Sequence, residues 1–143
     1  MNGQYGELIA ITNPDDTEVD MSEGYDANLR LVQKLITFGE NSPAEGTTKE
    51  VFGYDDSNRM NLAENYKTVD EEYVLISQAT MTYDSLGNKL GESLKIGVSG
   101  DTKNVVSTYN ELSFRDSLTY PGGTAISYED RRGTQYLIKY KFP

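Results

Sequence analysis

The segment YVLISQATMTY, residues 73–83, carries the clearest secondary-structure signal in the chain. Its odd-numbered residues, such as Tyr73 and Leu75, lie on one face of an extended strand, and its even-numbered residues, such as Val74, lie on the other. The residues that follow, DSLGN at 84–88, are typical of turns. The segment therefore predicts one arm of a β-hairpin, with the return arm over residues 90–99.

Further segments with strand character lie on both sides of this hairpin. They are residues 4–12, 49–54, 105–114, 124–128 and 134–142, separated by Gly, Pro, Asn and Asp. In the last segment Tyr136, Ile138, Tyr140 and Phe142 share one face. We expect a mainly β protein, an antiparallel β-sandwich or barrel of about seven strands, in a single domain spanning residues 1–143.

One α-helix is expected near residues 27–38. Asp26 stands where an N-cap belongs, Leu29, Val32, Leu35 and Ile36 follow at helix spacing, and Gly39 suits the position after the last turn. The alternative is a strand, because the same apolar residues also fit an extended segment. A short helical turn is expected at residues 61–66, and loops or extended arms at residues 13–25 and 40–48.

The sequence shows no obvious internal repeat. We find no period of 20–50 residues, so a solenoid or propeller is not predicted. The stretch Tyr83-Asp84-Ser85-Leu86-Gly87-Asn88 is similar to the Tyr-Asp-x-x-Gly-Asn/Arg unit of RHS-type repeats. This single copy covers a small fraction of the chain, and it implies a hairpin turn and nothing more.

The composition narrows the chemistry that the side chains can perform. The 143 residues include no His and no Cys, which removes the commonest general base, thiolate nucleophiles and the usual zinc, copper and iron ligands. We find no phosphate-binding glycine loop and no nucleophile motif around Ser99. We therefore expect a protein that is not an enzyme and that carries no cofactor.

Charge is distributed unevenly along the chain. The net charge is −10, with −11 over residues 1–72 and +1 over residues 73–143. No basic patch suited to nucleic acid is present, no apolar run is long enough to span a membrane, and the first residues do not resemble a secretory signal. We expect no nucleic-acid or membrane partner, and the charge asymmetry suits contacts between subunits.

Three kinds of candidate site remain. Asp15, Asp16, Glu18 and Asp20 form an oxygen-rich cluster of the kind that binds calcium, although they lack the spacing of an EF-hand. Paired carboxylates of a glycoside hydrolase are a further alternative, but no spacing in the sequence selects a pair. The candidate interface residues lie near the C-terminal end and are Tyr136, Tyr140, Phe142, Arg131 and Arg132.

These features favour a function carried by surfaces. The sequence predicts a non-enzymatic structural protein of a repetitive assembly, a homo-oligomer or one subunit among others. The assembly we expect is a bacteriophage virion, with the chain as a capsid-decorating, neck or tail subunit. The alternative is an extracellular carbohydrate-binding or adhesion β-sandwich module that binds calcium; its 11 Tyr would supply contact surfaces for sugars.

Overall fold

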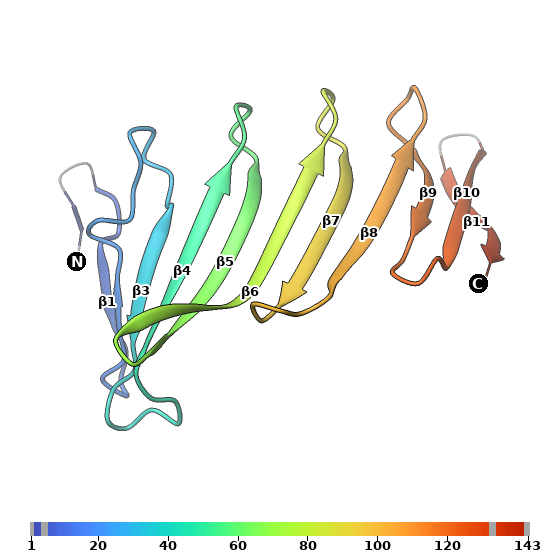
Figure 1. Cartoon of the computed structure of the whole chain (residues 1–143). Helices are drawn as coiled ribbons and strands as arrows, with labels where there is room; N and C mark the ends of the chain where they lie inside the picture. The colour runs from blue at the N-terminus through green and yellow to red at the C-terminus, as the bar shows by residue number, and fades with distance from the viewer. Residues whose placement is uncertain (1, 4–5, 132–133, 142–143) are drawn as a thin grey trace. The chain divides into compact units, whose positions relative to one another are not determined.

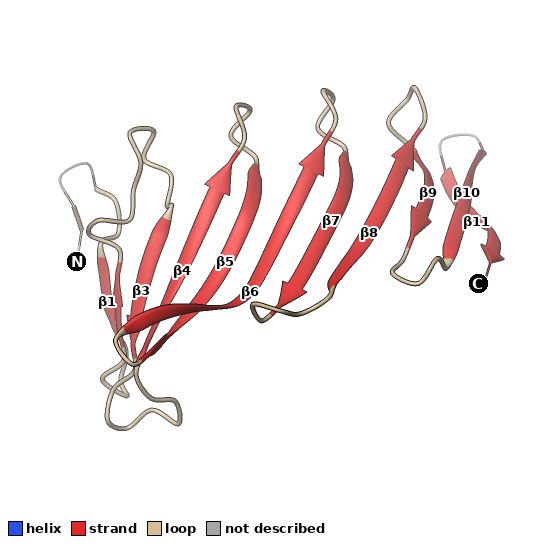
Figure 2. Cartoon of the chain, viewed as in Figure 1, coloured by secondary structure: helices blue, strands red, loops and turns tan. Residues whose placement is uncertain are grey.

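The fold is a meander of β-strands. The computed structural model describes residues 2–3, 6–131 and 134–141 and contains no helix within them (Figures 1 and 2). The strands occur in the sheet in the same order as in the sequence. They are β1 (Ala10–Thr12), β2 (Glu18–Asp20), β3 (Gln33–Thr37), β4 (Thr47–Tyr54), β5 (Met60–Val69), β6 (Glu72–Tyr83), β7 (Lys89–Ile96), β8 (Thr102–Tyr109), β9 (Arg115–Thr119), β10 (Ala125–Arg131) and β11 (Thr134–Lys141).

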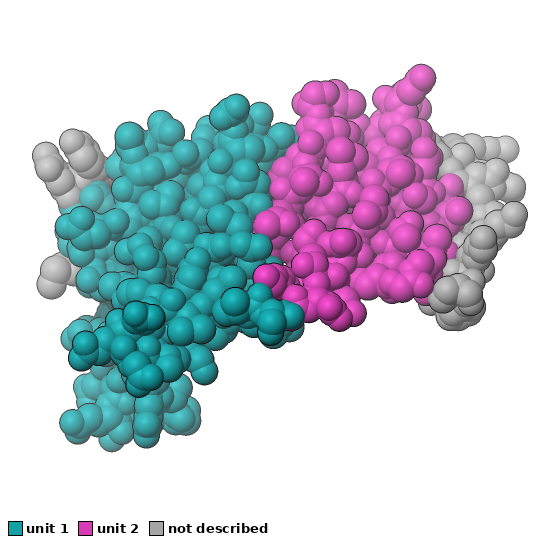
Figure 3. Space-filling view, in the orientation of Figure 1, with its two compact units in different colours: residues 1–78, 96–99 teal, residues 79–95, 100–143 magenta. Residues whose placement is uncertain are grey.

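The chain divides into two compact units (Figure 3). The first unit holds residues 1–78 and 96–99, and within it β1 to β5 pair in order, each antiparallel to the next. The second unit holds residues 79–95 and 100–143, and there β7 to β11 pair in the same way. The prediction of a mainly β, antiparallel protein is confirmed.

Polar pairs across neighbouring strands reinforce the first unit. Lys34 on β3 and Glu50 on β4 are register partners, and their side chains form an ion pair at 3.0 Å. Glu64 on β5 accepts hydrogen bonds from the Tyr66 hydroxyl at 2.8 Å and from the Gln78 amide at 2.6 Å. The bond to Glu64 raises the pKa of Tyr66, since it favours the protonated phenol.

The sheet has almost no buried core. Among the side chains that the structure describes, Met21 is the one buried hydrophobic residue, and none is less than 2% exposed. Large apolar side chains such as Leu94 and Val106 remain substantially exposed. One sheet layer leaves both faces open, whereas a sandwich buries its inner faces against each other. The expected sandwich or barrel of about seven strands is therefore wrong in both its layering and its strand number.

The predicted helix near residues 27–38 is also wrong. The segment begins in a tight turn and continues into β3, where Leu35 pairs with Lys49 and Ile36 with Thr48. Asp26 does accept backbone N–H groups, as an N-cap residue would, but it does so inside a hairpin turn. The strand alternative was the better interpretation of these apolar residues.

Other boundaries differ from expectation in smaller ways. The predicted helical turn at residues 61–66 lies within β5, and β9 was not predicted. The expected arm at residues 13–25 contains β2, whereas the segment 40–48 is a loop until β4 begins at Thr47. These segments are short or polar, so the pairing with neighbouring strands determines their conformation more than their own sequence does.

Candidate functional site

Hairpin turns of one conformation recur along the chain, and the four that directly follow a tyrosine are the most regular feature of the molecule. In each, the first of five residues donates its N–H to the carbonyl of the fifth, and the fourth donates to the carbonyl of the first. The fourth residue has a positive φ in every case, which is the geometry of a type I turn with a G1 bulge. The turns span Asp26–Arg30, Asp55–Arg59, Asp84–Asn88 and Asn110–Phe114.

The side chain of the first residue holds each turn closed. In the second turn, Asp55 Oδ1 accepts the backbone N–H groups of Ser57 and Arg59, both at 2.9 Å, and Oδ2 accepts Arg59 Nε at 2.7 Å. Asp26 makes the same three bonds in its own turn, and Asp84 and Asn110 bond equivalent backbone groups. These are Asx turns closed by a second backbone bond.

These hydrogen bonds shift the acidity of the carboxyl groups. The side-chain bond from Arg30, followed by the backbone bond from Arg30, lowers the pKa of Asp26. The backbone bond from Arg59 lowers the pKa of Asp55, and the side-chain bond from Asn88 lowers that of Asp84. Donors aimed at a carboxylate favour its charged form, so these turns are most stable when the acids are ionised.

A tyrosine precedes the turns at Tyr25, Tyr54, Tyr83 and Tyr109. The Tyr54 hydroxyl donates to the carbonyl of Leu31 at 2.9 Å, and Leu31 is the residue directly after the previous turn. In the second unit, the Tyr109 hydroxyl donates at 3.1 Å to the carbonyl of Lys89, which again follows a turn. Tyr54 and Tyr109 thus each fix their own hairpin against the preceding one.

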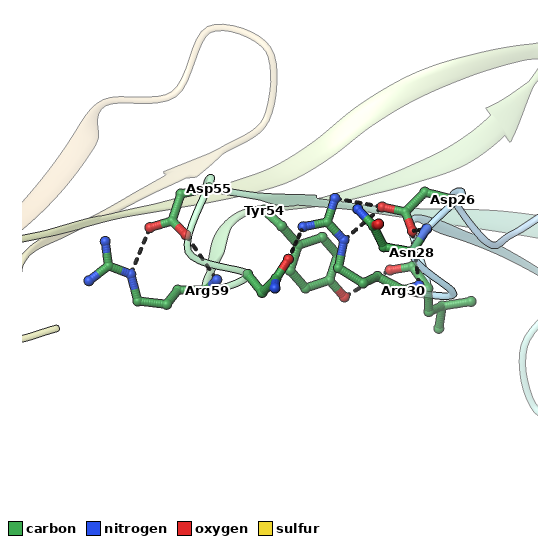
Figure 4. Close-up of polar contacts among 8 residues, drawn as sticks. Asp26, Asn28, Arg30, Tyr54, Asp55 and Arg59 are labelled. Atoms are coloured by element: carbon green, nitrogen blue, oxygen red, sulfur yellow. Dashed lines mark hydrogen bonds and ion pairs between the residues drawn. The ribbon is translucent and has the colours of Figure 1, made fainter.

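Side chains of adjacent turns also bond to each other. Arg30 lies over the ring of Tyr54, 4.9 Å from its centroid, and donates from Nη1 to Asn58 Oδ1 at 2.8 Å (Figure 4). In the second unit, Asn88 takes the place of the arginine and donates to Ser113 Oγ at 3.1 Å. We call these turns the hairpin ladder; it comprises residues 25–31 and 54–60, linked within the first unit, and residues 83–89 and 109–115, linked within the second.

A polar depression lies beside the ladder in the first unit. It has a volume of about 770 Å³ and is lined by Asn28, Arg30, Tyr54, Asp56 and Asn58. Amide and carboxylate groups of this kind can hydrogen-bond the hydroxyls of a ligand. Arg30 and Tyr54 already bond within the protein, so Asn28 and Asp56 are the side chains best placed to contact a ligand.

The predicted calcium ligands lie in and beside the turn between β1 and β2. Asp15 accepts the N–H of Thr17, Asp16 accepts the Asn41 amide, and Asp20 accepts both the N–H and the hydroxyl of Ser22. The two bonds from Ser22 lower the pKa of Asp20. Glu18 lies on β2 opposite Thr37. In the part of the chain that the structure describes, no three acidic, His or Cys side chains form a group that could hold a metal ion.

The predicted interface residues are only partly covered by the structure. Arg131 ends β10, and Tyr136 and Tyr140 lie in β11. Arg132 and Phe142 lie outside the described residues.

Within the described residues, no helix has the length and apolar character needed to cross a membrane.

The hairpin ladder contradicts the expectation of no internal repeat. Tyr25, Tyr54 and Tyr83 are spaced 29 residues apart, and each is followed by Asp. Residues 83–88 are therefore one of several turns that begin with this Tyr-Asp pair. The Tyr-Asp pairs were the signal that could have found the repeat. However, the fifth residue of the turn is Arg in two turns, Asn in the third and Phe in the fourth, and the last spacing is shorter.

Comparisons with known proteins add no further assignment. No protein-family model matches the chain. No curated protein shows significant sequence similarity to it.

Proposed function

We propose that this chain is a non-enzymatic structural protein of a repetitive assembly and that it works through contacts between subunits. The assembly is a bacteriophage virion, in which the chain is a capsid-decorating, neck or tail subunit. The proposal rests on one observation: the sheet buries a single hydrophobic side chain, Met21, among those described. A sheet stabilises a protein chiefly by burying at least one face, so a neighbouring molecule is the natural cover.

The surface area supports this proposal. The chain exposes 9886 Å², whereas a compact monomer of 16.0 kDa exposes about 7,400 Å². The excess, about 2,500 Å², exceeds the roughly 800 Å² that each partner contributes to a standard interface. The chain therefore has enough spare surface for a large contact with another subunit.

Light scattering on the purified chain tests the proposal. We expect a defined oligomer whose mass is an integer multiple of the chain's mass, because the uncovered sheet gains hydrophobic burial on association. Electron microscopy should show particles of uniform size. A monomer at every concentration, with no binding to capsid or tail components, would contradict the proposal.

The second candidate function is carbohydrate binding or adhesion, in an extracellular module. The observation that favours it is the polar depression lined by Asn28, Asp56 and Asn58, whose amide and carboxylate groups suit sugar hydroxyls. A thermal-shift screen with a glycan panel and with calcium tests it. Stabilisation by a glycan that disappears in an Asp56→Ala variant would favour this function.

A further inference from the structure

The two faces of the sheet in the second unit differ in polarity. Register partners in an antiparallel sheet lie on the same face, and residues two apart along a strand also share a face. Leu94 pairs with Lys103, Glu92 with Val105, and Leu118 with Ile126. These pairings place five apolar residues on one face, which we call the Leu94 face: Leu90, Leu94, Val105, Leu118 and Ile126.

The opposite face of the same strands is polar. The pairs Ser93 with Asn104 and Thr108 with Ser117 lie there. Val106 is the largest apolar residue that β8 contributes to this polar face, and it pairs with Gly91 and Thr119. Such a difference between faces is typical of a sheet that is covered on one side only.

The Leu94 face is open at its β7 edge and half-buried further along, at Val105, Leu118 and Ile126. Leu94 is 42% exposed and Leu90 36% exposed. A hollow of about 180 Å³ lies between β7, β8 and β9. Val105, Ser107 and Leu118 line it, together with the charged side chains of Lys89, Glu92 and Arg115. A hollow of this size accepts one side chain from a partner, as protein interfaces require for close packing.

The charge distribution indicates which partner fits this face. The first unit carries a net charge of −11, so its surface repels the same surface of a second copy. The second unit carries +1, and the charged residues Glu92 and Lys103 lie on the Leu94 face itself with opposite signs. Two copies can therefore meet through the second unit at little electrostatic cost.

We propose that a second copy of this chain packs against the Leu94 face with its own Leu94 face. The inference rests on the proposed function and names the contact through which the assembly begins. The same patch then serves both copies, related by a two-fold axis. The excess surface area of the chain is more than this contact requires.

Sedimentation velocity on three variants tests the contact. Val105→Glu and Leu94→Glu each place a carboxylate in the proposed interface, and we expect the dissociation constant of the dimer to rise about 30-fold or more. Val106→Glu is the matched control, because it makes the same change one residue along β8 on the opposite face. We expect its dissociation constant to stay near that of the unaltered chain. Circular dichroism on all three shows that they fold.

The outcomes separate this inference from the proposed function. If the unaltered chain associates and both interface variants associate equally well, the Leu94 face is not the contact, although the structural role stands. If Val106→Glu dissociates the dimer as strongly as Val105→Glu, the assignment of faces is wrong. A strictly monomeric unaltered chain would overturn self-association, and if it also binds no virion component, the proposed function fails with it.

Discussion

The hydroxyl of Tyr54 donates a hydrogen bond to the carbonyl oxygen of Leu31 at 2.9 Å, which fastens the hairpin at residues 55–59 to the one before it. The ring of Tyr54 lies under the guanidinium of Arg30 in the same place. One side chain thus makes a hydrogen bond and a cation–π contact to a neighbouring repeat. Because the sheet has so little buried core, such contacts between hairpins carry much of its specificity.

Tyr54→Phe tests the contribution of that bond. The change removes the hydroxyl and keeps the ring, so we expect the free energy of unfolding to fall by about 1 kcal/mol. Tyr73→Phe is the control, because Tyr73 is 47% exposed and its ring contact with Lys49 survives the change. Urea unfolding of both variants gives the comparison. Equal stability losses would show that the ladder bond contributes nothing of its own.

Asp55→Ala tests the turn itself. The change removes the acceptor of two backbone N–H groups and of Arg59 Nε, so we expect the melting temperature to fall. Asp56→Ala, one residue further along the same turn, serves as the control and should leave the melting temperature nearly unchanged. Differential scanning calorimetry measures both. If the two variants melt at the same temperature, the Asx bonds are not what holds the hairpin.

Stability should depend on pH through the turn carboxylates. The pKa values of Asp26, Asp55 and Asp84 lie below the ordinary value for Asp. A carboxyl group with a lowered pKa in the folded state stabilises the fold above its unfolded pKa, about 3.9, and this contribution is lost as pH falls through the folded pKa. We expect a flat stability profile from pH 7 to about 5 and a decline below about 4. Asp55→Asn should make that decline shallower, and an unchanged slope would contradict the assignment.

Leu29 occupies the strained position of its turn. Its φ is 59°, in the left-handed region, where Asn58 and Gly87 stand in the equivalent turns. Leu29→Asn should therefore raise the free energy of unfolding by up to about 1 kcal/mol, since Asn tolerates this conformation better than Leu. Gly87→Ala makes the opposite change and should lower it. Thermal melts of both variants check the sign, and a loss of stability in Leu29→Asn would show that the leucine side chain has a packing role.

The strands with strict alternation were predictable from sequence. The segment 73–83 was placed within one residue of β6, because its alternation and its following turn agree. The prediction of a helix near residues 27–38 failed because an N-cap and an Asx turn use the same chemistry. In both, a short acidic side chain accepts nearby backbone N–H groups. Asp26 satisfied both interpretations, and only the pairing of β3 with β4 distinguishes them.

The single layer and the ladder were harder to predict. Alternating strands indicate that a face is buried, but they do not say whether the cover comes from the same chain or from another. The contact between Tyr54 and Leu31 joins residues 23 positions apart, and nothing local in the sequence signals it. The depression lined by Asn28 and Asn58 depends on the same pairing of hairpins, and so it could not be predicted either.

Hydroxyl-radical footprinting of the unaltered chain at rising protein concentration tests the central claim most directly, because it reports which side chains a partner covers. We predict that oxidation of Leu90 and Leu94 falls as the chain associates, while oxidation of Val106 on the opposite face stays constant. Oxidation of Leu94 that is independent of concentration, in a chain shown by light scattering to be associated, would contradict the account.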